Sequence, residues 1–196
     1  MRFGEDSNFI RWLRIGTVKS TGKKPVESLS GAVVKALAKV MPNQRDKAIH
    51  RAKYVSGFGI SELLTLKVKD AAFYEYGALL HVTGKTGYRS VQITGRSVYE
   101  PQKWMMQMPL ATNDVEWFFS VLERPNRGRH LEETNIRKLL TTADGKAGIK
   151  RRLYPHVFRH TKASPLAPKV SESIIERTMG IDTREHNIMS LCAFKL

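Results

Sequence analysis

The chain has 196 residues, enough for one domain of ordinary size with a short attached segment but not for two large domains. Its 33 Lys and Arg residues against 18 Asp and Glu give a net charge of +15, and 41% of the residues are hydrophobic, so the composition excludes wholesale disorder and favours a polyanionic partner. The single cysteine, Cys192, excludes an internal disulfide framework and a cysteine-rich zinc site.

No apolar run approaches the length needed to cross a bilayer, and Glu5 and Asp6 interrupt the stretch where a secretion signal would need apolar residues. The basic residues are dispersed along the chain and not gathered on one amphipathic helix, which disfavours binding to a membrane surface. We therefore expect a cytoplasmic protein with no membrane partner.

The first clear boundary is the polar stretch at residues 18–25, which separates a short segment at 9–15 from the rest of the chain. Beyond it, Val33, Val34, Leu37 and Val40 recur at helical spacing, and a second helical pattern covers residues 46–55. A short helix over residues 61–66 follows, with Ser61 as its predicted N-cap. Helices therefore open the main domain.

The chain then changes character, because residues 72–76, 78–83 and 88–93 are rich in aromatic and β-branched side chains and are separated by Gly77 and by the turn at 84–87. This pattern predicts a small antiparallel β-meander. Further helices are predicted over 97–108, 132–147, 155–166, 171–179 and 184–194, with an extended segment at 116–121. The aromatic groups at 104–106 and 117–119 are predicted to be core. The fold class is α+β and mainly α-helical.

The densest group of polar side chains is His156, Arg159 and His160, whose spacing of three and four residues places them on one helix face. Histidines four residues apart also occur in zinc proteases, but Val157 stands where their glutamate would be, and no third ligand is evident, so we reject a metal site. The remaining alternative is structural, with a histidine that packs or caps and an arginine that is a surface charge.

Three separated motifs decide between these alternatives: GFGISELLTLK at residues 57–67, TGKTGYR at 83–89 and YPHVFRHT at 154–161. Together they resemble the catalytic domain of the tyrosine recombinase/integrase family, and within it the archaeal XerA-like integrases. The resemblance covers residues 26–196 and implies the DNA breaking-rejoining fold. It also implies that residues 1–25 are a remnant of the preceding core-binding region and a linker.

Members of this family cut one DNA strand with a tyrosine and use no metal or nucleotide cofactor. The resemblance therefore implies double-stranded DNA and other recombinase protomers as partners, and a role in DNA integration and recombination. Matched motif by motif, it implies four catalytic residues: Lys85, His156, Arg159 and His160. The lysine would protonate the departing 5′-oxygen, and the other three would bind the phosphate and assist proton transfer.

Three family positions are substituted. Gly59 stands where the family has its first arginine, Ile181 where it has a second histidine or tryptophan, and Cys192 where it has the nucleophilic tyrosine. We expect Cys192 to be a small buried hydrophobic residue instead of a nucleophile. Pro165 would end the helix that carries Arg159 early, or kink it. These departures predict that strand cleavage is impaired or lost.

Two functions of different class remain. The first is a recombinase-family DNA-binding protein with little cleavage of its own, or one that uses a tyrosine from another subunit. The alternative is a non-catalytic DNA-binding module that occupies recombination sites or modulates an active recombinase. A third reading, a ribosome- or RNA-associated protein, has no RNA-module signature to support it.

Overall fold

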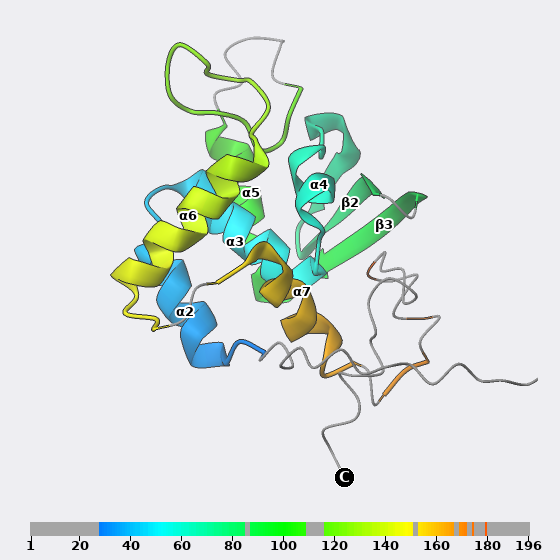
Figure 1. Ribbon diagram of the computed structural model, residues 1–196. Coiled ribbons are helices and arrows are strands. Elements are labelled where there is room, and N and C mark those ends of the chain that lie inside the picture. The colour runs from blue at the N-terminus through cyan, green and yellow to red at the C-terminus, as the bar shows by residue number, and fades with distance from the viewer. Residues whose placement is uncertain are drawn as a thin grey trace, which may run out of the picture.

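The computed structural model describes residues 28–84, 87–108, 116–150, 153–166, 169–171, 174 and 179. This part of the chain is mainly helical and contains one three-stranded antiparallel sheet in the order β1-β2-β3, as the sequence predicts (Figure 1). Its helices and strands are α2 (Gly31–Val40), α3 (Gln44–Ser56), α4 (Ile60–Leu64), β1 (Ala71–Tyr74), β2 (Gly77–Gly84), β3 (Gly87–Thr94), α5 (Tyr99–Gln107), α6 (Glu133–Lys146) and α7 (Pro155–Ala163).

The core forms around α3, which packs against α2, α5 and α7. Its most deeply buried side chains come from several elements and include Leu37, Ile49, Phe58 and Phe158. The two aromatic groups predicted to be core are confirmed in part: Trp104, Phe118 and Phe119 are buried, and the Trp104 indole N–H donates to the carbonyl of Phe118 at 2.8 Å. Burying an aromatic side chain of this size contributes about 1.5–3 kcal/mol.

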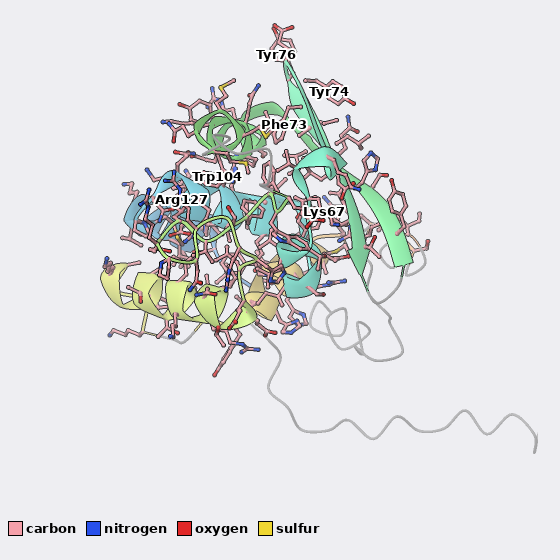
Figure 2. The ribbon with its side chains drawn as sticks, turned by 90° about the horizontal axis from the view of Figure 1, so that it is seen from above. Lys67, Phe73, Tyr74, Tyr76, Trp104 and Arg127 are labelled. Atoms are coloured by element: carbon pink, nitrogen blue, oxygen red, sulfur yellow. The ribbon has the colours of Figure 1, made fainter. Side chains whose placement is uncertain are left out.

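The sheet carries one face toward the helices and one toward solvent. In β3 the side chains alternate, with Arg89, Val91 and Ile93 buried and the intervening residues exposed. Figure 1 shows α4 lying between the sheet and the remaining helices. Figure 2 shows Tyr74 and Tyr76 at the end of the β1–β2 hairpin, which points away from the helices. Arg89 is therefore a charged side chain that points into the molecule.

The end of α3 is fixed by its backbone and by a close contact. Gly57 follows the helix with φ of 66°, and its N–H donates to the carbonyl of Lys53. A Cβ at Gly57 would also lie 2.5 Å from the Cε of Met179. The positive φ favours glycine at this position, whereas the contact requires only that the end of the flexible Met179 side chain move. The left-handed turn leads the chain directly into α4.

Some predictions need correction. The N-cap of α4 is Gly59 and not Ser61, because the Glu62 carboxylate accepts the Gly59 N–H at 2.6 Å and so allows the helix to begin one residue earlier. The segment at 116–121 forms only isolated bridges, from Trp117 to Lys67 and from Ser120 to His130.

Near its C-terminus the described chain corrects one helix boundary, because the helix predicted over 155–166 is three residues shorter. Helix α7 ends at Ala163, two residues before Pro165, as expected for a residue that cannot continue a helix. The segment 1–25, the predicted helix over 184–194 and most of that over 171–179 lie outside the described residues. In the described part, no helix combines the length and the apolar surface that a membrane span requires.

Candidate functional site

Helix α7 presents three of the predicted site residues. It begins at Pro155, a favourable first residue because its ring fixes a helical φ and it has no N–H to satisfy. His156 is exposed in the first turn, while Arg159 and His160 are half-buried one turn later. The helix thus places these side chains on one face, as their spacing predicts.

The centre of the site is a carboxylate that the sequence motif contains but to which no role was assigned. Glu62 of α4 forms a two-pronged ion pair with Arg89 of β3, with distances of 2.8 Å from Nε to Oε1 and 2.9 Å from Nη2 to Oε2. The two side chains are only 4% and 8% exposed. This buried pair joins the first turn of α4 to the inner face of the sheet.

Arg159 joins the same cluster from the other side. Its Nη1 lies 3.8 Å from Oε2 of Glu62, and its Nη2 donates to the carbonyl of Met179 at 2.5 Å. Burial lowers the pKa of Arg159, Glu62 raises it, and Arg89 lowers it. A guanidinium nevertheless stays protonated in proteins, so two arginines share one carboxylate. Glu62 thus brings two guanidinium groups close together, an arrangement that suits an anion.

A side chain at position 59 would lie directly against Arg159 and Glu62. The Gly59 φ of −60° and ψ of 159° suit any residue, so the backbone does not require glycine there. A Cβ at this position would lie 3.0 Å from Nη1 of Arg159 and 3.3 Å from Oε2 of Glu62. A side chain at position 59 would therefore project next to the Arg159 guanidinium, and Arg159 and Glu62 would have to shift by a few tenths of an ångström to admit it.

The β2–β3 hairpin reaches the same cluster. A Cβ on Gly84, the last residue of β2, would lie 2.8 Å from Oε1 of Glu62, so only glycine allows this strand end to approach so closely. Lys85 follows Gly84 directly in the sequence but lies outside the described residues, as do Ile181 and Cys192. The predictions for these three positions stay predictions.

A second unassigned residue is Lys53, in the last turn of α3. Its Nζ donates to the carbonyl of Phe58 at 3.0 Å, and the residue is 2% exposed. Burial lowers the pKa of Lys53 to about 7; the charge of Arg159 acts in the same direction, and Glu62 and Glu133 oppose it. The sequence does carry a signal, because Lys53 follows Ile49 at the i+4 spacing of the buried face of α3.

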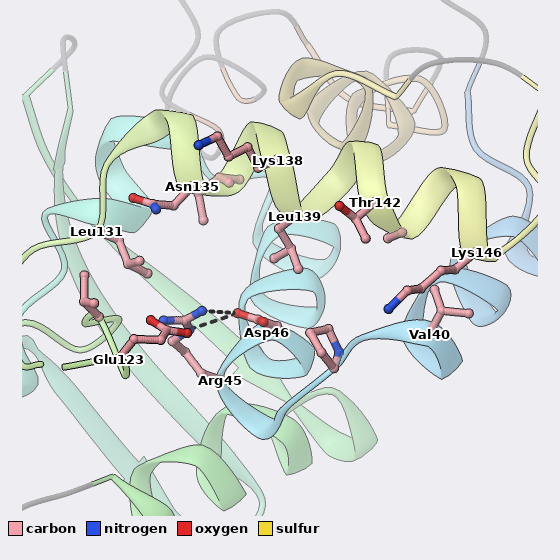
Figure 3. A pocket seen from close by; sticks show the side chains of 14 residues that line it. Val40, Arg45, Asp46, Glu123, Leu131, Asn135, Lys138, Leu139, Thr142 and Lys146 are labelled. Carbon is pink, nitrogen blue, oxygen red and sulfur yellow. Dashed lines mark hydrogen bonds and ion pairs between the residues drawn. The ribbon is translucent and has the colours of Figure 1, made fainter. Parts of the chain in front are cut away.

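A pocket of about 330 Å³ lies elsewhere, between α3, α6 and the segment before α6 (Figure 3). At its base Arg45 pairs with Asp46 at 2.8 Å and donates to the carbonyl of Ser120 at 3.0 Å. None of the predicted site residues lines this pocket. Within the described ranges, no three His, Cys, Asp or Glu side chains gather closely enough to hold a metal ion.

Comparison with known proteins gives consistent similarities. Residues 27–185 match the phage integrase family. The chain is 30% identical over 158 residues to tyrosine recombinase XerA of Pyrococcus furiosus, and the aligned region covers 79% of this chain and 53% of that protein. It is 28% identical over 142 residues to tyrosine recombinase XerC of Thermodesulfovibrio yellowstonii, covering 70% and 46%. The chain thus spans about half the length of these relatives.

Solved structures share the fold at lower identity. The XerH site-specific recombinase in its post-cleavage complex with the palindromic difH substrate superposes with a TM-score of 0.70 at 17% identity, covering 90% of this chain and 52% of that one. The XerA recombinase superposes with a TM-score of 0.69 at 22% identity, covering 85% and 60%. The mainly helical architecture with its small antiparallel sheet is therefore the architecture of these recombinases.

Proposed function

The chain belongs to the phage integrase family, and from this premise we propose that it is a DNA-binding protein of site-specific recombination and integration with impaired strand cleavage. The observation that carries the proposal is the cluster at Glu62, where Arg89 and Arg159 share one carboxylate and the neighbouring position 59 has no side chain. Such a cluster keeps the charge that binds a phosphate while lacking one of the groups that would stabilise its reaction.

The proposed division of labour follows from the chemistry of the side chains. Arg159 bonds the non-bridging oxygens of a DNA phosphate, since charge-assisted hydrogen bonds from a guanidinium are the strongest available for this purpose. His156 and His160 bind the phosphate and assist proton transfer from the same face of α7. Lys85 protonates the departing 5′-oxygen, and no metal or nucleotide takes part.

Impairment follows from two positions. Without a side chain at Gly59, the reacting phosphate loses one donor, which typically costs a factor of about 10² to 10³ in rate. At the position aligned with the nucleophile the chain has Cys192, and without an attacking hydroxyl the covalent route is closed. A tyrosine from another protomer would reopen it.

The alternative function is a non-catalytic module that occupies recombination sites or modulates an active recombinase. The empty position at Gly59 favours it, because DNA affinity needs only cations, whereas cleavage needs the complete set of donors. The two functions differ in one observable, the formation of a covalent protein–DNA adduct.

Double-stranded DNA is the proposed partner in both cases, together with other recombinase protomers. The net charge of +15 suits the phosphate backbone, and the similar XerH structure is a complex with its difH substrate. This partner also makes the cytoplasm the proposed location.

The test compares two variants that each remove one cation. Arg159→Ala should weaken binding of the full chain to a duplex about 10- to 100-fold, because it removes hydrogen bonds to a charged group. Arg137→Ala should change the affinity by no more than about threefold, since Arg137 is exposed and already pairs with Glu133. Equal affinities for the two variants, measured where both are folded, would contradict the proposal.

A further inference from the structure

Lys53 is an unusual residue to find buried. It is 2% exposed, and lysine is almost never buried to this extent without a charged partner. Within the described residues its ammonium makes one hydrogen bond, to the Phe58 carbonyl, and no ion pair. An ammonium group has three donors, so two have no partner in this part of the chain.

The position of Lys53 connects it to the candidate site. The Phe58 carbonyl that it bonds belongs to the peptide group that links Phe58 to Gly59, so the ammonium lies beside the backbone of position 59. Nη1 of Arg159 lies 3.0 Å from the place of a Cβ on the same glycine. Two cations from different helices, α3 and α7, therefore converge on the one position of the site that has no side chain.

The charges around Lys53 do not neutralise it. Arg159 of α7 repels its charge, and the carboxylates that oppose this effect are Glu62 of α4 and Glu133 of α6. Glu62 is already engaged by Arg89 of β3 through both oxygens, and Glu133 is exposed and pairs with Arg137. Among the residues that the structure describes, no carboxylate is dedicated to Lys53, so its charged form has no fixed counterion in this part of the chain.

We propose that Lys53 is the second phosphate-binding cation of this site, in the role that an arginine side chain at position 59 would otherwise have. The proposal rests on the proposed function, because it requires a DNA phosphate beside Arg159. A phosphate there supplies the missing counterion and accepts one of the two unused donors. An ammonium lacks the two-pronged geometry of a guanidinium, so Lys53 supports binding more than it supports cleavage.

Proton uptake is the readout that a merely structural lysine would not change. Since the pKa of Lys53 is lowered to about 7, most of the free protein at pH 8 has a neutral amine. A bound phosphate favours the charged form, so binding should draw in up to about 0.9 proton per site. Calorimetric titration of the full chain with a short duplex, in two buffers of different ionisation enthalpy, measures this number.

We expect Lys53→Met to lose this uptake and about tenfold in affinity, while Lys39→Met, at an exposed lysine of α2, keeps the uptake and changes affinity by less than about threefold. Adding Gly59→Arg to Lys53→Met should restore the affinity, because the new guanidinium projects beside Arg159. If Lys53 had only a structural role through its bond to the Phe58 carbonyl, we would expect no such rescue, because an arginine at position 59 does not replace that bond.

The outcomes separate the two proposals. If Arg159→Ala leaves the affinity unchanged, DNA binds elsewhere and the proposed function fails together with this inference. If Arg159→Ala weakens binding but Lys53→Met changes neither the affinity nor the proton uptake, the role of Lys53 alone is refuted. Loss of affinity in Lys53→Met with wild-type proton uptake and no rescue by Gly59→Arg also refutes it.

Discussion

Replacing Glu62 with glutamine is the sharpest perturbation of the site, because it removes the charge that Arg89 and Arg159 share. The glutamine amide oxygen can still accept the Gly59 N–H, so the start of α4 keeps its hydrogen bond. What is lost is the two-pronged ion pair with Arg89, whose guanidinium remains inside the protein. The variant therefore isolates what the Glu62 charge contributes to this buried ion pair.

The magnitude follows from burial. The side chains of Glu62 and Arg89 are 4% and 8% exposed, so the pair belongs with buried ion pairs, for which removal of one partner costs about 3–5 kcal/mol. A domain of this kind has a total stability of about 5–15 kcal/mol. At about 2–4 °C per kcal/mol, the melting temperature should fall by about 6–20 °C.

Urea unfolding followed by circular dichroism measures this loss in Glu62→Gln. The matched control is Glu116→Gln, which removes the same charge from an ion pair with Lys67 whose side chains are 53% and 31% exposed. Exposed pairs contribute about 0–1 kcal/mol, so the control should stay close to the wild type. Equal losses in the two variants would refute the reasoning that burial gives the Glu62 pair its importance.

Three further predictions concern pH and salt. Burial and then Arg51 lower the pKa of His50 to about 4, so the unfolded chain binds more protons below pH 6.5 and the free energy of unfolding should fall by up to about 1.4 kcal/mol per pH unit from pH 6.5 to 4. His50→Leu should reduce this dependence in urea unfolding, and an unchanged slope would count against it. The pKa of Lys53 is lowered to about 7, so the unfolded chain binds more protons than the folded chain above pH 7. The free energy of unfolding of the wild type should therefore rise with pH from 7 to 10, relative to that of Lys53→Met. Parallel plots of this free energy against pH for the two proteins would exclude the pKa shift. The logarithm of duplex affinity should fall with the logarithm of salt concentration with a slope of about −0.9 per neutralised phosphate, and a slope near zero in fluorescence anisotropy would argue against backbone binding.

Local patterns were sufficient to predict most of the fold. Runs of β-branched and aromatic residues separated by glycines predicted the strands over 71–74, 77–84 and 87–94. The helices α4 and α5 on either side of them in the chain were predicted from their apolar spacing. The prediction of Ser61 as the N-cap of α4 was wrong, because the Glu62 side chain accepts the Gly59 N–H and the helix begins directly after Gly59. That choice depends on a side-chain geometry that periodicity does not encode.

For the candidate site, the sequence predicted the relative placement of side chains only where one element holds them, and the roles of these residues stay predictions. His156, Arg159 and His160 are set by the spacing of a single helix. The pair of Glu62 with Arg89 joins residues 27 positions apart, and the approach of Lys53 to Arg159 joins two helices. Such contacts depend on how the sheet and helices pack, and a pattern of neighbouring letters does not contain that information.

The most direct measurement is the reaction of the full chain with a nicked suicide duplex, which traps any covalent protein–DNA adduct. The wild type should form none, and Cys192→Tyr or Gly59→Arg alone should add little, whereas the double variant Gly59→Arg/Cys192→Tyr should form at least a trace of adduct. The further change Arg159→Ala should abolish that adduct, because a nucleophile is then present but the phosphate is no longer held. An adduct with the wild-type chain would contradict the account, and its disappearance in Cys192→Ala would identify the thiol as the nucleophile.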